Sequence, residues 1–398
     1  MSDDNLAGYE ESISAIRFIA RINGLWPFDK GARQYQCAVP ACLIIFFIII
    51  PQTTKAIYSR NDLDTVVEVL STCELIEIVV LLKLFGLLYN KRDFQKLLTQ
   101  VEDDWKISFE YEQKIMWSNA RFSKLAAIFC VIATAGSVIL HSFLFLLSVN
   151  SINKSEYNNS TPVIYQLFIK SHFPFETQNS PIYEIICFSQ FSAAFLSTFV
   201  FSTFDGYFFL SILHFSGQLY NLKYNVYNLI TQDSIQNKSF TRKLAVVVCR
   251  HRHIMSYIDL IENNFNLIFL LQIFSSTVVL CMQGYQFVLI ISQGTRLFTS
   301  IVFIIFFMCS SIISIFVYCY IAEIIRTESD NLLYAVYEID WINLKSRDAN
   351  LLLIFMSRLI LPVKITVGKL VPFSLEYFTT VMKTSAGYLS VLLAVAKD

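Results

Sequence analysis

The chain has 398 residues, of which 55% are hydrophobic and 16% are charged, whereas soluble domains carry roughly 25% charged residues. Its 31 Lys and Arg residues balance 31 Asp and Glu residues, so the formal net charge is zero. The apolar content excludes a disordered chain, the zero charge excludes a strongly basic nucleic-acid-binding protein, and nine cysteines are too sparse for a secreted disulfide scaffold. A soluble protein with a large core or a membrane protein remains.

The first predicted element is an amphipathic helix over Tyr9–Asn23, because its apolar residues recur at helical spacing. This helix either lies on the inner face of a membrane or covers a cytosolic helical bundle. The segment Met1–Glu11 is acidic and lacks the basic start of a signal peptide. We therefore expect the N-terminus to stay in the cytosol.

Seven apolar segments are long enough to cross a membrane, since a hydrocarbon core ~30 Å thick requires about 20 residues. Soluble helices bury one apolar stripe, but segments 43–50 and 301–308 are apolar on every side. Pro51 interrupts the first segment and makes it the weakest. We predict an all-α membrane protein with spans at about 37–58, 66–89, 124–149, 182–215, 265–292, 298–322 and 373–396.

The segments between the spans predict a helical bundle inside the cell. Segment 90–124 is charged and lacks glycine, and segments 220–262 and 329–356 also have helical composition. The fourth span, at 1.5 Å per residue, is roughly 51 Å long and must tilt or project into the cytosol. The basic stretch around His251 and His253 is typical of a solvated patch. With no internal repeat or linker, residues 1–398 are expected to form one domain.

The distribution of basic residues predicts the orientation of the chain. Segments 1–36, 90–124, 214–262 and 323–372 hold 23 of the 31 Lys and Arg residues, and the alternate segments hold six. Basic residues favour the cytosolic side, so we expect the N-terminus inside and the C-terminus outside. A G-protein-coupled receptor has the opposite orientation. A transporter is also disfavoured, because matching pairs of broken spans are absent.

Three glycosylation sequons agree with this orientation, because all three lie in the segment 150–181 that the charge count places outside. They begin at Asn153, Asn158 and Asn159.

The sequence contains no Gly-rich phosphate loop, no HExxH and no Gly-x-Ser-x-Gly motif. We expect no enzymatic activity, no cofactor, no metal site and no nucleic-acid partner.

Charged residues within the predicted spans are more informative, because they are costly in a membrane. Glu74 and Glu77 share one face of the second span, where they either line a polar site or make structural contacts. Asp205 is expected to be structural, and Lys383 either snorkels or faces water.

The outer halves of spans two to six hold aromatic and small polar residues of the kind that line pockets for small apolar ligands, although ordinary helix interfaces share this composition. The candidate ligand contacts are Cys73, Glu74, Glu77, Ser137, His141, Phe145, Tyr183, Phe188, Phe191, Gln283, Phe287 and Phe298.

The last span places Thr380, Thr384, Tyr388, Val391 and Val395 on one helical face. This stripe is polar at its inner end and apolar at its outer end. Repeated around a symmetry axis, it forms a wet pore with a hydrophobic constriction that gates by dewetting. A packed helix face is the alternative interpretation.

Three stretches carry a resemblance to a known family: Gly24-Leu25-Trp26-Pro27, Glu328-Ser329…Tyr337…Asp340-Trp341 with Leu351–Arg358 and Pro362, and Phe373-Ser374-Leu375…Phe378…Lys383-Thr384-Ser385-Ala386-Gly387-Tyr388. They resemble the insect odorant receptors, and the length and the inverted topology of the chain are similar to that family over nearly the whole chain. The C-terminal stretch is the most specific, although Ala386, Gly387 and Leu389 depart from the Ser-Tyr-Ser-Tyr-Phe pattern of that family. The gustatory receptors are less similar, because Gly387, Ala394 and Val395 replace their terminal Thr, Gln and Phe.

The resemblance implies an odorant-gated, non-selective cation channel in the plasma membrane of a sensory neuron. Its implied partners are co-receptor subunits in a heteromeric tetramer, small hydrophobic odorants, permeant cations and membrane lipids. The short loop between spans four and five is similar to that of a ligand-tuned subunit rather than the shared co-receptor. The hydrophobic gate of the family maps by motif onto Val391, with Val395 one turn outward, and Lys383, Thr384 and Tyr388 belong to the same pore helix.

Overall fold

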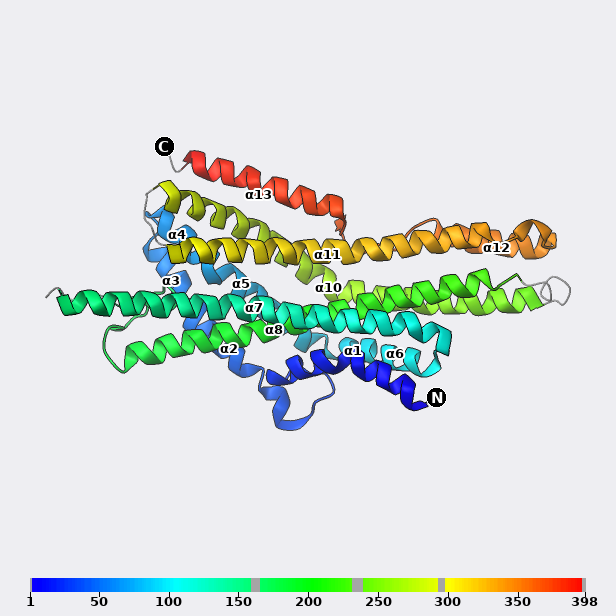
Figure 1. The fold of residues 1–398 in the computed structure, drawn as a ribbon, viewed down its shortest axis with the longest axis horizontal. Coiled ribbons are helices and arrows are strands. Elements are labelled where there is room, and N and C mark those ends of the chain that lie inside the picture. The colour runs from blue at the N-terminus through cyan, green and yellow to red at the C-terminus, as the bar shows by residue number, and fades with distance from the viewer. Residues whose placement is uncertain (1, 159–164, 231–238, 293–297, 396–398) are drawn as a thin grey trace.

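The computed structural model describes residues 2–158, 165–230, 239–292 and 298–395. Helices dominate this part of the chain, which confirms the predicted all-α class (Figure 1). In chain order the elements are α1 (Ser2–Ile22), η1 (Gly31–Tyr35), α2 (Ala38–Ile44), η2 (Ile45–Ile49), α3 (Ile50–Tyr58), α4 (Leu63–Val69), η3 (Leu70–Glu74), α5 (Leu75–Tyr89), α6 (Lys91–Ile107), α7 (Glu110–Asn158), α8 (Ile182–Tyr227), α10 (Ser239–Ser292), α11 (Phe298–Glu338), η4 (Trp341–Asn343), α12 (Ser346–Leu359), β1 (Thr366–Val367), β2 (Val371–Pro372) and α13 (Leu375–Val395).

Four long helices, α7, α8, α10 and α11, run along the long axis of the molecule (Figure 1). They contain 49, 46, 54 and 41 residues, so at 1.5 Å per residue they are roughly 62 to 81 Å long. Each continues beyond a hydrocarbon core ~30 Å thick. The predicted cytosolic segments are therefore helical continuations of the spans, and α6 and α12 pack beside them at the end remote from α4 (Figure 1).

Among the described residues, five helical segments are long and apolar enough to cross a membrane. The other two predicted spans coincide with α4–η3–α5 and with α13. The five segments are Gly31–Tyr58, Glu110–Val149, Ile182–Tyr227, Phe240–Ser292 and Ser300–Glu338.

Pro51 disturbs the first span without ending it. A proline has no N–H to give to the carbonyl four residues earlier, which here is that of Phe47, in the π-helical turn η2. The Nε2 of Gln190 on α8 donates to that carbonyl at 3.3 Å. The carbonyl of Pro51 itself accepts from the backbone N of His172 at 3.0 Å. The irregular turn thus ties the first span to α8 and to the segment before it.

Helix α1 packs against the bundle through its apolar face, which favours the second of the two sequence interpretations. Ile13, Ile16 and Ala20 are fully buried, and the helix contacts α6, α7 and α8. Gly24 ends the helix with φ of 66°, a conformation that glycine adopts without strain. Trp26 then stacks on Tyr207 of α8 with ring centroids 6.3 Å apart. The Gly-Leu-Trp-Pro stretch is therefore an inward-packing turn.

Asp104 of α6 pairs with basic side chains from α8 and α10 in the part of the bundle that is predicted to be cytosolic. His214 Nε2 lies 2.9 Å from its carboxylate, Arg250 3.0 Å and His253 3.3 Å. Burial raises the pKa of Asp104, but its hydrogen bonds to His214 and His253 and the charge of Arg250 outweigh burial and hold that pKa below its usual range. Arg252 of the predicted solvated patch is exposed, whereas Arg250 and His253 pair with this buried carboxylate from another helix.

Helix α13 lies at one edge of the molecule and follows a short antiparallel hairpin in which Thr366 pairs with Pro372 (Figure 1). Its buried face packs on α10. Ser385 donates to the carbonyl of Thr277 at 3.5 Å. Gly284 of α10 allows close packing here, because an added Cβ would lie 2.8 Å from a terminal methyl group of Leu389, whose side chain would have to shift.

Candidate ligand-binding site

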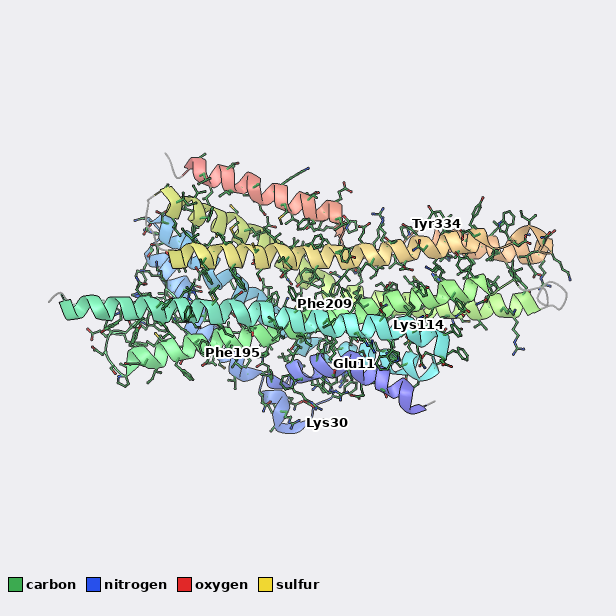
Figure 2. All side chains as sticks on the ribbon, in the orientation of Figure 1. Glu11, Lys30, Lys114, Phe195, Phe209 and Tyr334 are labelled. Carbon is green, nitrogen blue, oxygen red and sulfur yellow. The ribbon has the colours of Figure 1, made fainter. Side chains whose placement is uncertain are left out.

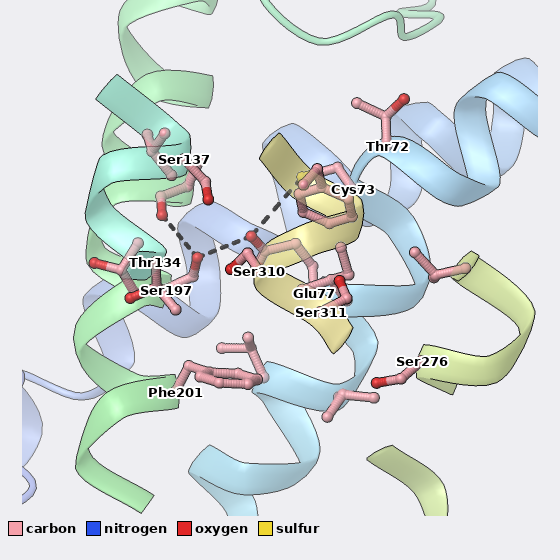
Figure 3. A pocket seen from close by; sticks show the side chains of 18 of the residues that line it. Thr72, Cys73, Glu77, Thr134, Ser137, Ser197, Phe201, Ser276, Ser310 and Ser311 are labelled. Carbon is pink, nitrogen blue, oxygen red and sulfur yellow. Dashed lines mark hydrogen bonds between the residues drawn. The ribbon is translucent and has the colours of Figure 1, made fainter. Parts of the chain in front are cut away.

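A cavity of about 170 Å³ lies between η3, α5, α7, α8, α10 and α11, and residues 168–169 close one side of it (Figure 3). An engineered cavity of about 150 Å³ with apolar walls binds benzene, so the space suits a small organic molecule. The lining residues are Thr72, Cys73, Ile76, Glu77, Val79, Val80, Thr134, Ser137, Val138, His141, Phe168, Ile169, Ala194, Ser197, Thr198, Phe201, Gln272, Ser275, Ser276, Val279, Phe303, Phe307, Ser310, Ser311, Ser314 and Ile315.

Glu77 is the carboxylate on this wall, and its two oxygens differ. Oε1 accepts a hydrogen bond from Ser197 Oγ at 2.8 Å and lies 3.8 Å from the sulfur of Cys73 (Figure 3). Oε2 is buried and has no hydrogen-bond partner. The whole residue is only 3% exposed. A buried carboxylate oxygen without a partner is costly, so this wall is suited to a ligand that supplies one.

Cys73, Glu77, Ser137 and His141 are the predicted ligand contacts that line the cavity. Cys73 and Glu77 are brought to the same side by the π-helical turn η3, which runs directly into α5. Such turns occur frequently at functional sites.

The segment after residue 164 folds back over the cavity and supplies Phe168 and Ile169, which sequence reasoning missed. Gln190 of α8 holds it, because its Oε1 accepts from Ile169 N at 3.0 Å and its Nε2 donates to Ser171 Oγ at 2.7 Å. His141 Nε2 donates to the carbonyl of Phe168 at 3.0 Å. No periodic signal marks this segment, because its burial depends on partners from three helices.

Two predicted aromatic contacts lie outside the cavity lining and pack against a residue that lines it. Phe145 and Phe191 pack edge-on against the ring of Phe168, with centroids 5.5 and 6.1 Å away. They shape the cavity through Phe168.

Helix α11 lines the cavity with residues that the sequence analysis also passed over. Phe303, Phe307, Ser310, Ser311 and Ser314 follow the i, i+4, i+7, i+8, i+11 spacing of one helical face. This serine-bearing face was a signal in the sequence, hidden within a segment that is otherwise apolar all round.

The remaining predicted contacts whose side chains are described lie away from the cavity, because their helices turn them elsewhere. Glu74 accepts from Thr53 Oγ1 at 2.6 Å, and Tyr183 donates to the carbonyl of Gln166 at 2.9 Å. Gln283 donates to the carbonyl of Ser71 at 3.2 Å. Phe188 is 70% exposed, Phe287 is half-buried outside the lining, and the side chain of Phe298 lies outside the described residues.

A buried ion pair lies next to the cavity. Lys83 Nζ is 2.7 Å from Asp205 Oδ1, and both side chains are fully buried. Tyr318 donates to Asp205 Oδ2 at 2.7 Å and accepts from Gln272 Nε2 at 2.9 Å. The ammonium group of Lys83 also lies 3.3 Å from the ring centroid of Phe201. Since Gln272 and Phe201 line the cavity, this network connects the cavity wall to α11.

The predicted pore stripe is exposed on α13. Thr380, Thr384, Tyr388 and Val391 are all exposed, with Tyr388 at 57% and Val391 at 60%. Lys383 beside them is also exposed, and the side chain of Val395 lies outside the described residues.

The predicted glycosylation sites fall at the end of α7. The side chains of Asn153 and Asn158, and the whole of Asn159, lie outside the described residues.

A family model described as 7tm Odorant receptor matches residues 63–386. The chain belongs to the odorant receptor family. Odorant receptor 13a of Drosophila melanogaster is 24% identical over 420 residues, which cover 95% of this chain and 94% of that protein. Odorant receptor 10 of Aedes albopictus is 26% identical over 219 residues, or 54% of this chain and 56% of the other. The protein is therefore a membrane-spanning receptor of olfaction, in a family of receptors rather than enzymes.

A solved structure supports the fold of the receptor. The insect olfactory receptor OR5 from Machilis hrabei, in complex with eugenol, aligns over 96% of this chain and 97% of its own, with a TM-score of 0.80 and 17% identity. A second structure of OR5 gives a TM-score of 0.73 over the same shares. The seven-helix fold of the insect receptors is thus shared, which confirms the expected fold class.

Proposed function

We propose that this receptor is a ligand-tuned subunit that forms an odorant-gated, non-selective cation channel together with co-receptor subunits. The observation that carries the proposal is the exposed stripe on α13. One face of this helix packs on α10, whereas the opposite stripe, polar at Thr380 and Thr384 and apolar at Val391, remains exposed. A stripe of this composition suits the wall of a shared pore with a hydrophobic gate.

The cavity supports the odorant-binding part of the proposal. Its volume of about 170 Å³ fits small hydrophobic molecules, and its wall combines aromatic and aliphatic side chains with a few polar groups. In this proposal the receptor acts as one domain in the plasma membrane, where lipids surround its spans.

A packed route links the cavity to the pore helix. Gln272 on the wall bonds Tyr318, whose ring lies 6.3 Å from that of Phe373, just before α13. Phe269 packs edge-on against Phe373 at 5.6 Å. A ligand shifts gating only through its different affinity for the open and closed states, and this route is where such a difference reaches α13.

The cytosolic end offers a surface for assembly with other subunits. Tyr334, Tyr337, Ile342 and Leu361 are between 62% and 83% exposed around α11 and α12. Figure 2 shows Tyr334 on the outer side of α11. Exposed apolar groups of this kind mark protein contacts, and the proposed contact is between subunits of the tetramer.

The test is the substitution Val391→Ser, expressed with the co-receptor. A smaller, polar residue at the constriction favours a wet pore, so basal current should rise several-fold. Ala386→Ser is the matched control, because Ala386 is exposed on another side of α13 and should leave basal current unchanged. Unchanged basal current and ion selectivity in Val391→Ser would refute the pore role.

A C-terminal tag tests the orientation of the chain. If antibodies reach the tag on intact cells, the orientation is that of the proposed channel and not that of a G-protein-coupled receptor.

A further inference from the structure

We propose that the cavity selects small apolar amines, whose protonated nitrogen binds Glu77. This inference rests on the proposed odorant-binding function and names the ligand class that the site takes.

The first argument is the carboxyl group on the cavity wall that lacks a partner for one of its oxygens. Glu77 is the one acidic or basic residue among the lining residues apart from His141. The Nε2 of His141 already donates to the carbonyl of Phe168. Lys83, the nearby buried cation, is taken up by Asp205. Glu77 thus lines the cavity and keeps one buried oxygen without a partner, and an ammonium group supplies a charge-assisted hydrogen-bond donor for this carboxyl group.

The second argument is that six of the ten hydroxyl groups on the wall, together with Gln272, present acceptors. Gln272 gives its Nε2 to Tyr318, and its Oε1 is buried without a partner. Hydroxyl groups on the wall spend their only proton on backbone carbonyls, so that they present lone pairs. These hydroxyls belong to Thr72, Thr134, Ser137, Thr198, Ser275 and Ser314. A primary ammonium group has three protons for such a surface, whereas an ester or a ketone has none.

The apolar part of the wall defines the rest of the ligand. Val79, Val138, Phe303 and Phe307 line the same cavity, whose volume limits the molecule to roughly the size of benzene with a short substituent. The inferred ligand is a compact hydrocarbon or aromatic ring that carries one amino group.

The experiment compares benzylamine, benzyl alcohol and toluene, which differ only in the polar group. Glu77→Gln keeps the size of the side chain and removes its charge. Because a hydrogen bond to a charged group contributes about 1.5–3 kcal/mol, we expect the substitution to weaken the response to benzylamine by about 10-fold to 100-fold. Responses to benzyl alcohol and toluene should change less than about threefold.

Glu74→Gln is the matched control, because Glu74 is also buried on the same segment but bonds Thr53 and does not line the cavity. It should leave all three responses unchanged. Glu77→Asp retains the charge and should keep the preference for benzylamine at reduced potency. Surface labelling verifies that each variant reaches the membrane.

Thermal unfolding of the purified receptor separates the two proposals. If benzylamine stabilises the wild type and not Glu77→Gln, yet no ligand evokes current, the channel function fails and the amine site stands. If Glu77→Gln alters all three ligands alike, or the wild type binds toluene or benzyl alcohol as well as it binds benzylamine, the amine site is overturned.

Discussion

Two buried carboxylates, Asp205 on α8 and Glu77 on α5, differ in how completely their oxygens are hydrogen-bonded. Asp205 is saturated, because Lys83 occupies one oxygen and Tyr318 the other. Glu77 shares one oxygen with Ser197 and leaves the other without a partner beside the cavity. Burial of a charge is therefore a poor guide to a binding site, since both residues are buried. A missing partner on a residue that lines the cavity distinguishes Glu77 from Asp205, and also from Glu74, which has an unpartnered oxygen but does not line the cavity.

The largest expected effect comes from breaking the saturated pair. Lys83→Met leaves Asp205 buried without its counter-charge, which costs about 3–5 kcal/mol when one member of such a pair is removed. We expect little receptor at the cell surface and a strongly lowered unfolding temperature. Adding Asp205→Asn removes the orphaned charge and should recover most of the stability. A double variant as unstable as Lys83→Met would show that the pair acts through something other than charge compensation.

The next effect concerns the hydroxyl that links the ion pair to the cavity wall. Tyr318→Phe leaves Asp205 Oδ2 and Gln272 Nε2 without their shared partner, at a cost of about 1–3 kcal/mol. The unfolding temperature should fall by less than for Lys83→Met. Phe316→Leu is a control on the same helix, with a half-exposed ring. Equal stability of Tyr318→Phe and the wild type would contradict the bridging role.

Loosening the segment that closes the cavity should lower stability less than the substitutions above, but it should clearly weaken the response to ligands. Gln190→Leu removes the bonds to Ile169 and Ser171 and should weaken every ligand response by roughly 10-fold, since each lost net hydrogen bond is worth about 1 kcal/mol. The measure is a dose–response curve in cells with the co-receptor. An effect limited to one ligand would mean that Gln190 contacts ligand rather than holding the closing segment.

The smallest expected change in stability is that of Glu77→Gln, and it tests most directly whether Glu77 differs from Asp205. Glu77→Gln keeps an oxygen that accepts from Ser197 and removes a buried carboxylate oxygen without a partner, so the free energy of unfolding should not fall. Calorimetry or a thermal unfolding assay without ligand measures it. A loss comparable to that of Lys83→Met would make Glu77 a structural residue like Asp205.

The long apolar runs made the helical fold predictable, because they are a property of the sequence alone. The charge asymmetry predicts the orientation of the chain, which stays a prediction. Cys73, Glu77, Ser137 and His141 could be anticipated as polar groups in the outer halves of spans. The rotation of each helix about its own axis could not be predicted. Phe188, for example, was expected to contact ligand but faces outward. Phe168 was unpredictable for another reason: its burial depends on His141 and on the hold of Gln190 over the next residue, contacts far apart in sequence.

Hydrogen bonds from side chains to main-chain atoms hold together the elements around the cavity. Gln190 reaches the carbonyl of Phe47 and both backbone groups of Ile169, and Gln283 reaches that of Ser71. Main-chain atoms are present whatever side chain a position carries. Substitutions of the lining residues can therefore alter what the receptor recognises while its scaffold persists, so that new ligand preferences can evolve by single steps from an already folded protein.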